Sequence, residues 1–337
     1  MLLFGFVKTF KKNSVYAVIV IYLLTSYFTL VNSPKPYVDT FDIFKDVFFI
    51  LLKFINPYSA IFSSTYPGAA NHFHYLPFSF IFTFPFSALL KDPRYSIIFA
   101  NVTSSILLYN IYKKNTISFS SKKIALYITV FLFLPRSFYI LEHMYLDPII
   151  FMFFLLFYYF KSKIIKLSLI FLSVFFSIKQ HIFMLFPIFL IDETIRYSLL
   201  KHWKYFLLPF VLIVFFIIID TKSFFFYTVY AMLIPVINQN APVRSPFYAS
   251  LSFLTFLNIF PNLGSLFKKM ISVILFLCLY IIILIKKCHY IRKVSFTLFV
   301  FCYFMYLSFY NHYYFIALFI YFDFFRNTLI YSKSKNN

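Results

Sequence analysis

The chain has 337 residues, of which 62% are hydrophobic and only 12% are charged, whereas a soluble domain carries roughly 25% charged residues. A soluble fold could not bury this much apolar surface, so the composition excludes an ordinary soluble domain. The formal net charge of +21 does not indicate nucleic-acid binding, because the basic residues form short clusters between apolar runs and no basic stripe is mixed with exposed aromatic residues.

The apolar runs have the length of membrane-spanning helices. A helix needs about 20 residues to cross a hydrocarbon core of ~30 Å, and backbone in lipid must form its hydrogen bonds within a helix or a closed barrel. Barrel strands would alternate apolar and polar residues, and these runs do not. We therefore predict an all-α fold: a single domain, residues 1–337, built as a polytopic bundle of about ten transmembrane helices. The predicted spans are about 14–32, 94–112, 124–141, 148–160, 167–178, 182–192, 204–220, 270–286, 294–310 and 313–331.

Basic clusters determine the predicted orientation. Lysine and arginine gather before the first span and after the second, fourth, sixth, eighth and tenth. An even number of spans places all of these clusters in the cytoplasm, as the positive-inside rule requires. We therefore predict a cell-membrane protein with both termini cytoplasmic. Residues 33–93 and 221–269 are then the two long outer segments.

The apolar stretch 73–90 tests this arrangement. Counted as a span, it would invert every later loop and place later basic clusters outside. It also contains Pro77 and Pro85, which disfavour an uninterrupted helix. We interpret it as an interfacial or re-entrant helix of the first outer loop; the alternative is a true span and an odd count.

Acidic residues concentrate on the predicted outer side. The first outer loop holds Asp39, Asp42 and Asp46, and their spacing places them along one face if the segment is helical. Clustered carboxylates repel one another, which raises the pKa of one of them and suits a general base. The alternative is a solvated loop with ordinary aspartates.

No metal site is predicted from the spacing of possible ligands. Cys278, Cys288 and Cys302 lack metal spacing and are expected to be inert thiols. His143 and His312 lie on the outer side, also without metal spacing. The acidic first loop nevertheless has oxygen ligands of the kind that a divalent cation prefers.

Several short motifs follow one another on the predicted outer side. They are Asp39 and Asp42, Asn56-Pro57-Tyr58, Tyr75-Leu76-Pro77, Asp92-Pro93-Arg94, Glu142-His143-Met144-Tyr145-Leu146-Asp147-Pro148, Lys179-Gln180 and His312-Tyr313-Tyr314. In this order and on this side, the motifs resemble those of the GT-C superfamily of polytopic glycosyltransferases, above all the polyprenyl-phosphate-mannose-dependent mannosyltransferases. The chain departs from that pattern in having only three glycines, where family members often carry glycine in these segments.

The resemblance implies a reaction and a set of roles. A hexose, with mannose expected first, would move with inversion from a polyprenyl phosphate to an extracytoplasmic glycan, lipid or protein. The implied catalytic base is Asp42 or Asp39. The implied acceptor-binding or secondary acids are Asp46, Glu142 and Asp147. The implied donor-phosphate ligands are Lys179, Arg94, Lys91 and Arg244, and the implied cavity-lining residues are Tyr58, Tyr75, His312 and Tyr313.

Other classes of membrane protein remain open. A transporter or lipid flippase is one, although such proteins often contain inverted repeats and helices broken near the midplane, and we detect no repeat. A glycan polymerase or ligase usually relies on arginines in its outer loops, of which Arg244 alone stands out in the late loop. An accessory subunit without activity is the third alternative. Membrane lipids are expected partners in every case, and nucleic acid in none.

Overall fold

The computed structural model describes residues 14–36, 38–62, 72–115, 120–230, 265–304 and 310–334. All regular secondary structure in these ranges is helical, which confirms the predicted all-α class. The elements are α2 (Ser14–Asn32), α3 (Asp39–Leu52), α4 (Pro77–Leu90), α5 (Tyr95–Asn115), α6 (Ser121–Leu132), α7 (Ser137–Glu142), α8 (Asp147–Phe160), α9 (Ile165–Phe176), η1 (Gln180–Leu185), α10 (Phe186–Ile191), α11 (Glu193–Lys201), α12 (Trp203–Leu207), α13 (Phe210–Ile219), α14 (Thr221–Phe225), η2 (Phe226–Tyr230), α18 (Ser265–Ile285), α19 (Tyr290–Phe304) and α20 (Tyr310–Ser334).

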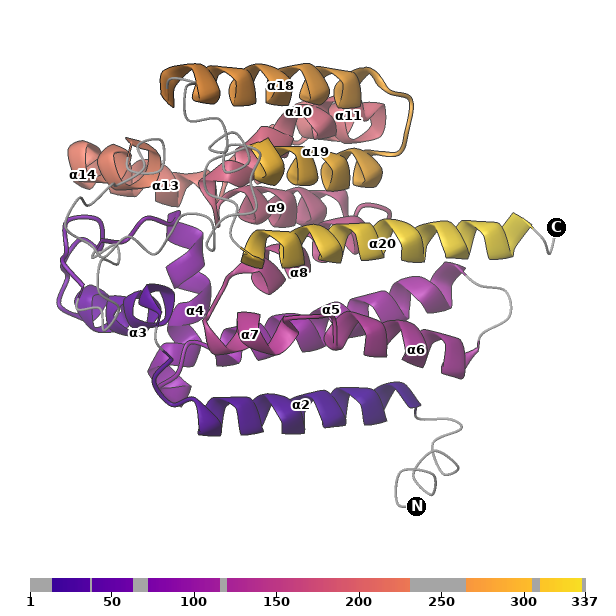
Figure 1. Ribbon diagram of the computed structural model, residues 1–337, viewed down its shortest axis with the longest axis horizontal. Coiled ribbons are helices and arrows are strands. Elements are labelled where there is room, and N and C mark those ends of the chain that lie inside the picture. The colour runs from indigo at the N-terminus through magenta and orange to yellow at the C-terminus, as the bar shows by residue number, and fades with distance from the viewer. Residues whose placement is uncertain are drawn as a thin grey trace.

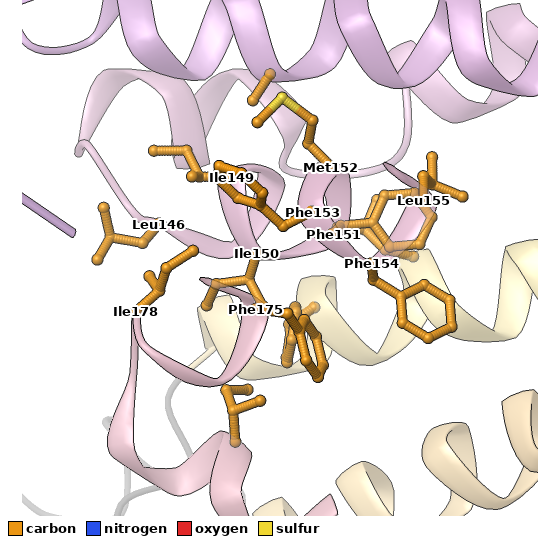
Figure 2. Packing of buried hydrophobic residues seen from close by; sticks show 14 of the residues in the cluster. Leu146, Ile149, Ile150, Phe151, Met152, Phe153, Phe154, Leu155, Phe175 and Ile178 are labelled. Atoms are coloured by element: carbon orange, nitrogen blue, oxygen red, sulfur yellow. The ribbon is translucent and has the colours of Figure 1, made fainter. Parts of the chain in front are cut away.

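Helix α8 forms the centre of the molecule. It has a proline in its first turn, where the missing N–H would have no helical partner in any case. Every residue from 147 to 155 is buried, and the helix packs against α5, α9 and α20. Figure 2 shows the side chains of Phe151 and Phe154 within this core, together with Phe175 of α9. A helix that is apolar on all sides is typical of a protein core or of a membrane span.

Several of the predicted spans are interrupted in the structure. The range 124–141 contains two helices, α6 and α7, because the chain turns at Arg136, whose φ is 71°. The range 182–192 consists of η1 and the short α10. The range 204–220 is divided between α12 and α13, with Pro209 at the junction, where the absent N–H cannot continue a helical ladder.

Few helices are long enough to cross a bilayer without interruption. Among the described residues, α2 alone passes by length and apolar composition. A second candidate is a pair of helices, Phe210–Ile219 and Thr221–Thr228. The chain bends by 120° between them, so they pass the test only if the pair counts as one broken span. With its 14 residues, α8 rises about 21 Å at 1.5 Å per residue, less than the hydrocarbon thickness. The count of about ten spans therefore stays a prediction.

The helices define two ends of the molecule. Figure 1 shows α2, α5, α6 and α20 running in similar directions, while α4 crosses that direction near α3 and α14. We call the end that holds α3, α4 and α14 the acidic end. The start of α2 and the end of α20 lie at the opposite end, which we call the basic end. There Lys114 Nζ donates to Ser162 Oγ at 3.0 Å, linking the last turn of α5 to the α8–α9 turn.

Large apolar side chains face outward along several helices. Helix α2 presents most of its apolar residues on an exposed face, and α13 and α18 do the same, with Ile218 and Ile285 being 75% and 76% exposed. Soluble monomers rarely expose contiguous apolar patches larger than a few hundred Å². These exposed helix faces therefore need an apolar environment, such as lipid or another protein surface, to cover them.

Candidate functional site at the acidic end

The three aspartates of the first outer segment lie on one helix, as their spacing requires. Asp39, Asp42 and Asp46 occupy a flank of α3 beside its buried face, and all three are half-buried. Asp39 is the first residue of the helix, and its Oδ1 accepts a hydrogen bond from the Thr40 N–H at 2.7 Å. The helix N-terminus favours a negative charge at this position. Asp42 and Asp46 follow about one and two turns further along.

Hydrogen bonds hold two distant motifs together at this end. The side-chain amide of Gln180 donates to the carbonyl of His74 at 2.9 Å. The buried Tyr58 donates its hydroxyl to the carbonyl of Tyr75 at 2.8 Å. Tyr58 thus fixes the backbone of the Tyr75-Leu76-Pro77 motif, which lies beside Lys179-Gln180.

His74 lies between the acid of α3 and the lysine that precedes η1. It interacts electrostatically with both Asp39 and Lys179. Burial has the largest effect and lowers the pKa of His74; Lys179 lowers it further, while Asp39 opposes the shift. The Nδ1 atom lies 3.2 Å from the carbonyl oxygen of His72. Because a carbonyl can only accept, Nδ1 carries the proton and Nε2 is the acceptor of the neutral ring.

Two tyrosines also surround Asp39. Burial raises the pKa of the Tyr75 hydroxyl, and the negative charge of Asp39 raises it further. Burial likewise raises the pKa of Tyr145, with neighbouring tyrosines and Asp39 adding to the effect. Asp39, on α3, therefore interacts electrostatically with residues from two other parts of the chain: the segment before α4 and the α7–α8 turn.

Lys179 forms a buried ion pair with Asp147, the first residue of α8. Its Nζ lies 3.1 Å from Asp147 Oδ1, and the two side chains are 6% and 0% exposed. The second oxygen of Asp147, Oε1 of Gln180 and the hydroxyl of Tyr314 have no hydrogen-bond partner within the described part of the chain. Buried polar atoms are normally hydrogen-bonded, and carboxylate and amide oxygens accept hydrogen bonds, so the pair and these atoms form a polar centre suited to a hydroxylated ligand.

The first turn of α20 reaches the same centre. The ring of His312 lies 5.9 Å from that of His181, which directly follows Lys179-Gln180. Tyr313 is half-buried and packs at the edge of the hydrophobic core. The last outer motif of the sequence thus meets the lysine motif in space.

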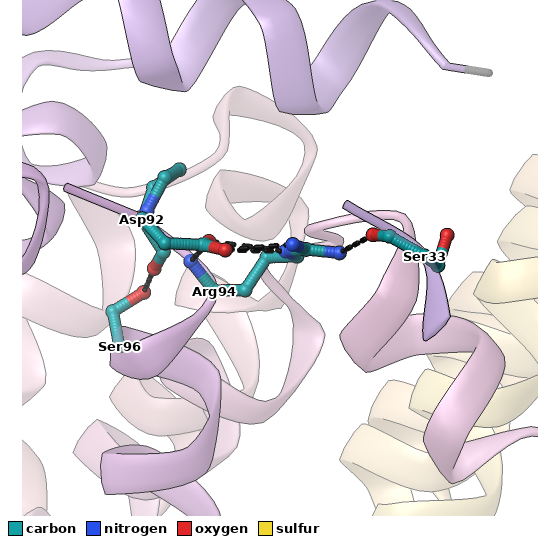
Figure 3. A network of polar contacts seen from close by, with 5 residues as sticks. Ser33, Asp92, Arg94 and Ser96 are labelled. Atoms are coloured by element: carbon teal, nitrogen blue, oxygen red, sulfur yellow. Dashed lines mark hydrogen bonds and ion pairs between the residues drawn. The ribbon is translucent and has the colours of Figure 1, made fainter. Parts of the chain in front are cut away.

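Arg94 has partners other than those expected of a phosphate ligand. Its guanidinium binds Asp92 through Nη2 and Nε, at 2.6 and 3.0 Å, and donates from Nη1 to the Ser33 carbonyl at 2.6 Å. Figure 3 shows this network, which joins the end of α2 to the start of α5. Arg94 is 1% exposed, and its guanidinium lies 4.7 Å from the centre of the Phe41 ring. The observed partners give Arg94 a role in positioning α3.

The remaining predicted residues lie apart from the polar centre or outside the described ranges. Lys91 is exposed at the C-terminus of α4, with a left-handed φ of 59°. Glu142 ends α7 and is half-buried, with its carboxylate 3.9 Å from Nδ1 of His143. Arg244 lies outside the described residues.

Sequence reasoning missed His74 and Tyr145 as members of the site. His74 directly precedes Tyr75-Leu76-Pro77, and Tyr145 stands inside the motif that runs from Glu142 to Pro148. Adjacency to these motifs was the only available signal. A single tyrosine in a chain with 29 of them carries no spacing that would single it out.

No group of three or more histidine, cysteine, aspartate or glutamate side chains that could hold a metal ion occurs in the described ranges. No protein-family model matches the chain, and a search of curated proteins finds no match. The geometry of the acidic end and the order of its motifs therefore carry the functional argument.

Proposed function

We propose that the chain is a polytopic membrane glycosyltransferase that moves a hexose, with mannose expected first, from a polyprenyl-phosphate donor to an extracytoplasmic acceptor. The proposal is carried by the buried ion pair of Lys179 with Asp147 at the acidic end, together with the electrostatic interaction of His74 with both Lys179 and Asp39. These residues come from segments whose motifs resemble those of the GT-C superfamily. A carboxylate and a buried ammonium in one site provide the base and the phosphate-binding cation that such a transfer needs.

Three features support the membrane setting. The outward apolar faces of α2, α13 and α18 would be covered by lipid. Lysine-bearing turns gather at the basic end, opposite the acids of α3, which matches the charge sidedness of membrane proteins. Helix α4 crosses the direction of the long helices at the acidic end, as an interfacial segment would (Figure 1).

The proposed reaction is a single displacement. Asp39 accepts the proton of an acceptor hydroxyl while that oxygen forms a bond to the anomeric carbon. The bond between this carbon and the lipid phosphate breaks on the opposite face, so the configuration inverts, and the electron pair leaves with the phosphate. An ammonium has three donors; one donor of Lys179 goes to Asp147, and another would make a charge-assisted hydrogen bond to the leaving phosphate.

The variants Asp39→Asn and Asp42→Asn test the proposal as a matched pair, because both acids lie on one flank of α3. Transfer from polyprenyl-phosphate hexoses is measured with the purified full chain in lipid. We expect Asp39→Asn to lower kcat by about 10²- to 10⁴-fold, since asparagine keeps the shape but accepts no proton, with only a small decrease in thermal stability from the loss of a negative charge at the helix N-terminus. We expect Asp42→Asn to retain more activity, because Asp39 lies beside His74 and Tyr145.

Two outcomes would contradict this proposal. Full activity in both variants would remove the first-loop acids from the mechanism. A wild-type chain that transfers no hexose from any polyprenyl phosphate but moves a solute across vesicles would be a transporter.

A further inference from the structure

Three aromatic rings, one of them exposed, lie close together around the α7–α8 turn. Tyr139 and His143 have ring centroids 4.0 Å apart. The rings of His143 and Tyr145 are 6.0 Å apart, and their planes differ by only 6°. Tyr139 is 38% exposed, and Tyr145 interacts electrostatically with Asp39. We call the rings of Tyr139, His143 and Tyr145 the aromatic platform.

Charged groups of both signs flank the aromatic platform. The guanidinium of Arg136 lies over Tyr139, 5.6 Å from the ring centroid. The carboxylate of Glu142 lies 3.9 Å from Nδ1 of His143. Aromatic faces cover apolar surface, while guanidinium and carboxylate groups donate and accept hydrogen bonds. A pyranose has the complementary form, with an apolar C–H face and hydroxyls around its edge.

Two residues with left-handed backbone bracket the first two rings. Arg136 and Met144 are non-glycine residues with φ angles of 71° and 58°, and they bracket Tyr139 and His143. The left-handed conformation costs a residue with a Cβ roughly 1–2 kcal/mol. Such residues persist where the surrounding structure determines them, and they cluster at ligand-binding sites. A platform held in this way binds its ligand without a further cost of ordering.

Exposed tyrosines also occur in the aromatic belts of membrane proteins, where they face the headgroup region. Tyr27 of α2 fits that description, since it is 55% exposed on the outward face of an apolar helix. The platform differs from Tyr27 in two respects: charged groups flank it, and Tyr145 interacts electrostatically with Asp39. These differences favour a binding site over a lipid contact.

We propose that the aromatic platform is the acceptor subsite and that the acceptor is a glycan. Its terminal pyranose would lie against Tyr139, the exposed ring of the platform, hydrogen-bond to Glu142 and Arg136, and direct one hydroxyl toward Asp39. This assignment rests on the proposed transferase function. That function leaves glycan, lipid and protein acceptors open, and the aromatic platform favours the glycan.

The first experiment measures binding without any donor. The full chain in lipid nanodiscs is titrated with methyl α-mannopyranoside, methyl α-glucopyranoside and α-mannobiose, and binding is followed by saturation-transfer NMR. We expect Tyr139→Ala to weaken sugar binding about tenfold, the effect of losing one aromatic contact. Tyr139→Phe keeps the ring but loses the hydroxyl that interacts with Tyr145, so it should retain more of the binding than Tyr139→Ala. Tyr27→Ala, the matched control, removes an exposed tyrosine from α2 and should also leave binding unchanged.

The possible results separate the subsite from the proposed function. Absence of binding for all of these sugars, or equal affinities in the wild type and Tyr139→Ala, overturns the glycan subsite. Transfer from polyprenyl-phosphate hexose to a threonine-rich peptide but to none of the sugars also overturns it, while the transferase proposal stands. Sugar binding that depends on Tyr139, without transfer from any polyprenyl-phosphate hexose, supports the subsite and refutes the transferase.

Discussion

The sequence predicts the positions of some residues of the site but not of others. The spacing of Asp39, Asp42 and Asp46 predicts a shared helix flank, because helical periodicity alone determines it. The pair of Asp147 and Lys179 joins positions 32 residues apart and depends on how α8 packs against α9 and η1. A single sequence shows that both residues lie on the predicted outer side, but nothing in their spacing shows that they are partners.

The buried ion pair predicts an asymmetric response to substitution. Lys179→Met leaves the fully buried carboxylate of Asp147 without its cation, and removal of one partner of a buried pair typically costs about 3–5 kcal/mol. The double variant Lys179→Met/Asp147→Leu replaces both charges by apolar groups and should recover most of that loss. Thermal unfolding of the full chain in one lipid composition measures both effects. Equal destabilisation of the single and double variants would contradict a coupled pair.

At the level of helices, apolar runs predict where helices occur but not where they break. The predicted span 14–32 coincides with α2 (Ser14–Asn32), and 148–160 matches α8 to within a residue. The range 124–141 contains a turn at Arg136. An apolar run has the same composition whether the chain continues as one helix or turns, so hydropathy cannot locate that break. The outer stretch 73–90 is largely helical as predicted. Pro77 lies in the first turn of α4, where proline is tolerated, but the helix also continues through Pro85, so the expectation that Pro85 would interrupt it was wrong.

His289, at the start of α19, is expected to make the free energy of unfolding depend on pH. Nδ1 of His289 accepts a hydrogen bond from the Ile291 N–H at 3.2 Å, which requires an unprotonated nitrogen. Burial, the largest effect, and the positive charge of Arg326 lower the pKa of His289 from 6.5 to about 4. The unfolded chain therefore takes up a proton at a higher pH than the folded chain. The contribution of His289 to stability is complete above the unfolded pKa and is lost as the pH falls from about 6.5 toward 4.

The variant His289→Asn isolates this contribution. Asparagine caps helices well and does not titrate in this range. The melting temperature of the wild type should fall between pH 6.5 and pH 4, and that of His289→Asn should fall less. Parallel decreases in the two proteins would show that His289 does not determine the acid sensitivity.

Across the whole molecule, the sequence predicts a grouping of charges but not the internal geometry of the site. Clusters of lysine alternate with apolar runs, so an even count of spans places them on one side. In the structure, Lys161 binds Asp192 at 3.4 Å, which ties the α8–α9 turn to the start of α11 at the basic end. The contacts at the acidic end depend instead on which outer segments meet, and hydropathy contains no information about that.

The proposed orientation of the chain in a membrane is based on this charge grouping and can be measured with single cysteines. The native Cys278, Cys288 and Cys302 are first replaced by serine. Ser59→Cys then places an exposed thiol at the acidic end, next to Tyr58, and Ser162→Cys places one in the α8–α9 turn at the basic end. Lysine-rich turns are retained in the cytoplasm, so a membrane-impermeant maleimide should label Ser59→Cys in intact cells and Ser162→Cys only after permeabilisation. The reverse pattern would invert the orientation and move the acids to the cytoplasmic face, while labelling of both thiols in intact cells would contradict a chain that separates its two ends across a bilayer.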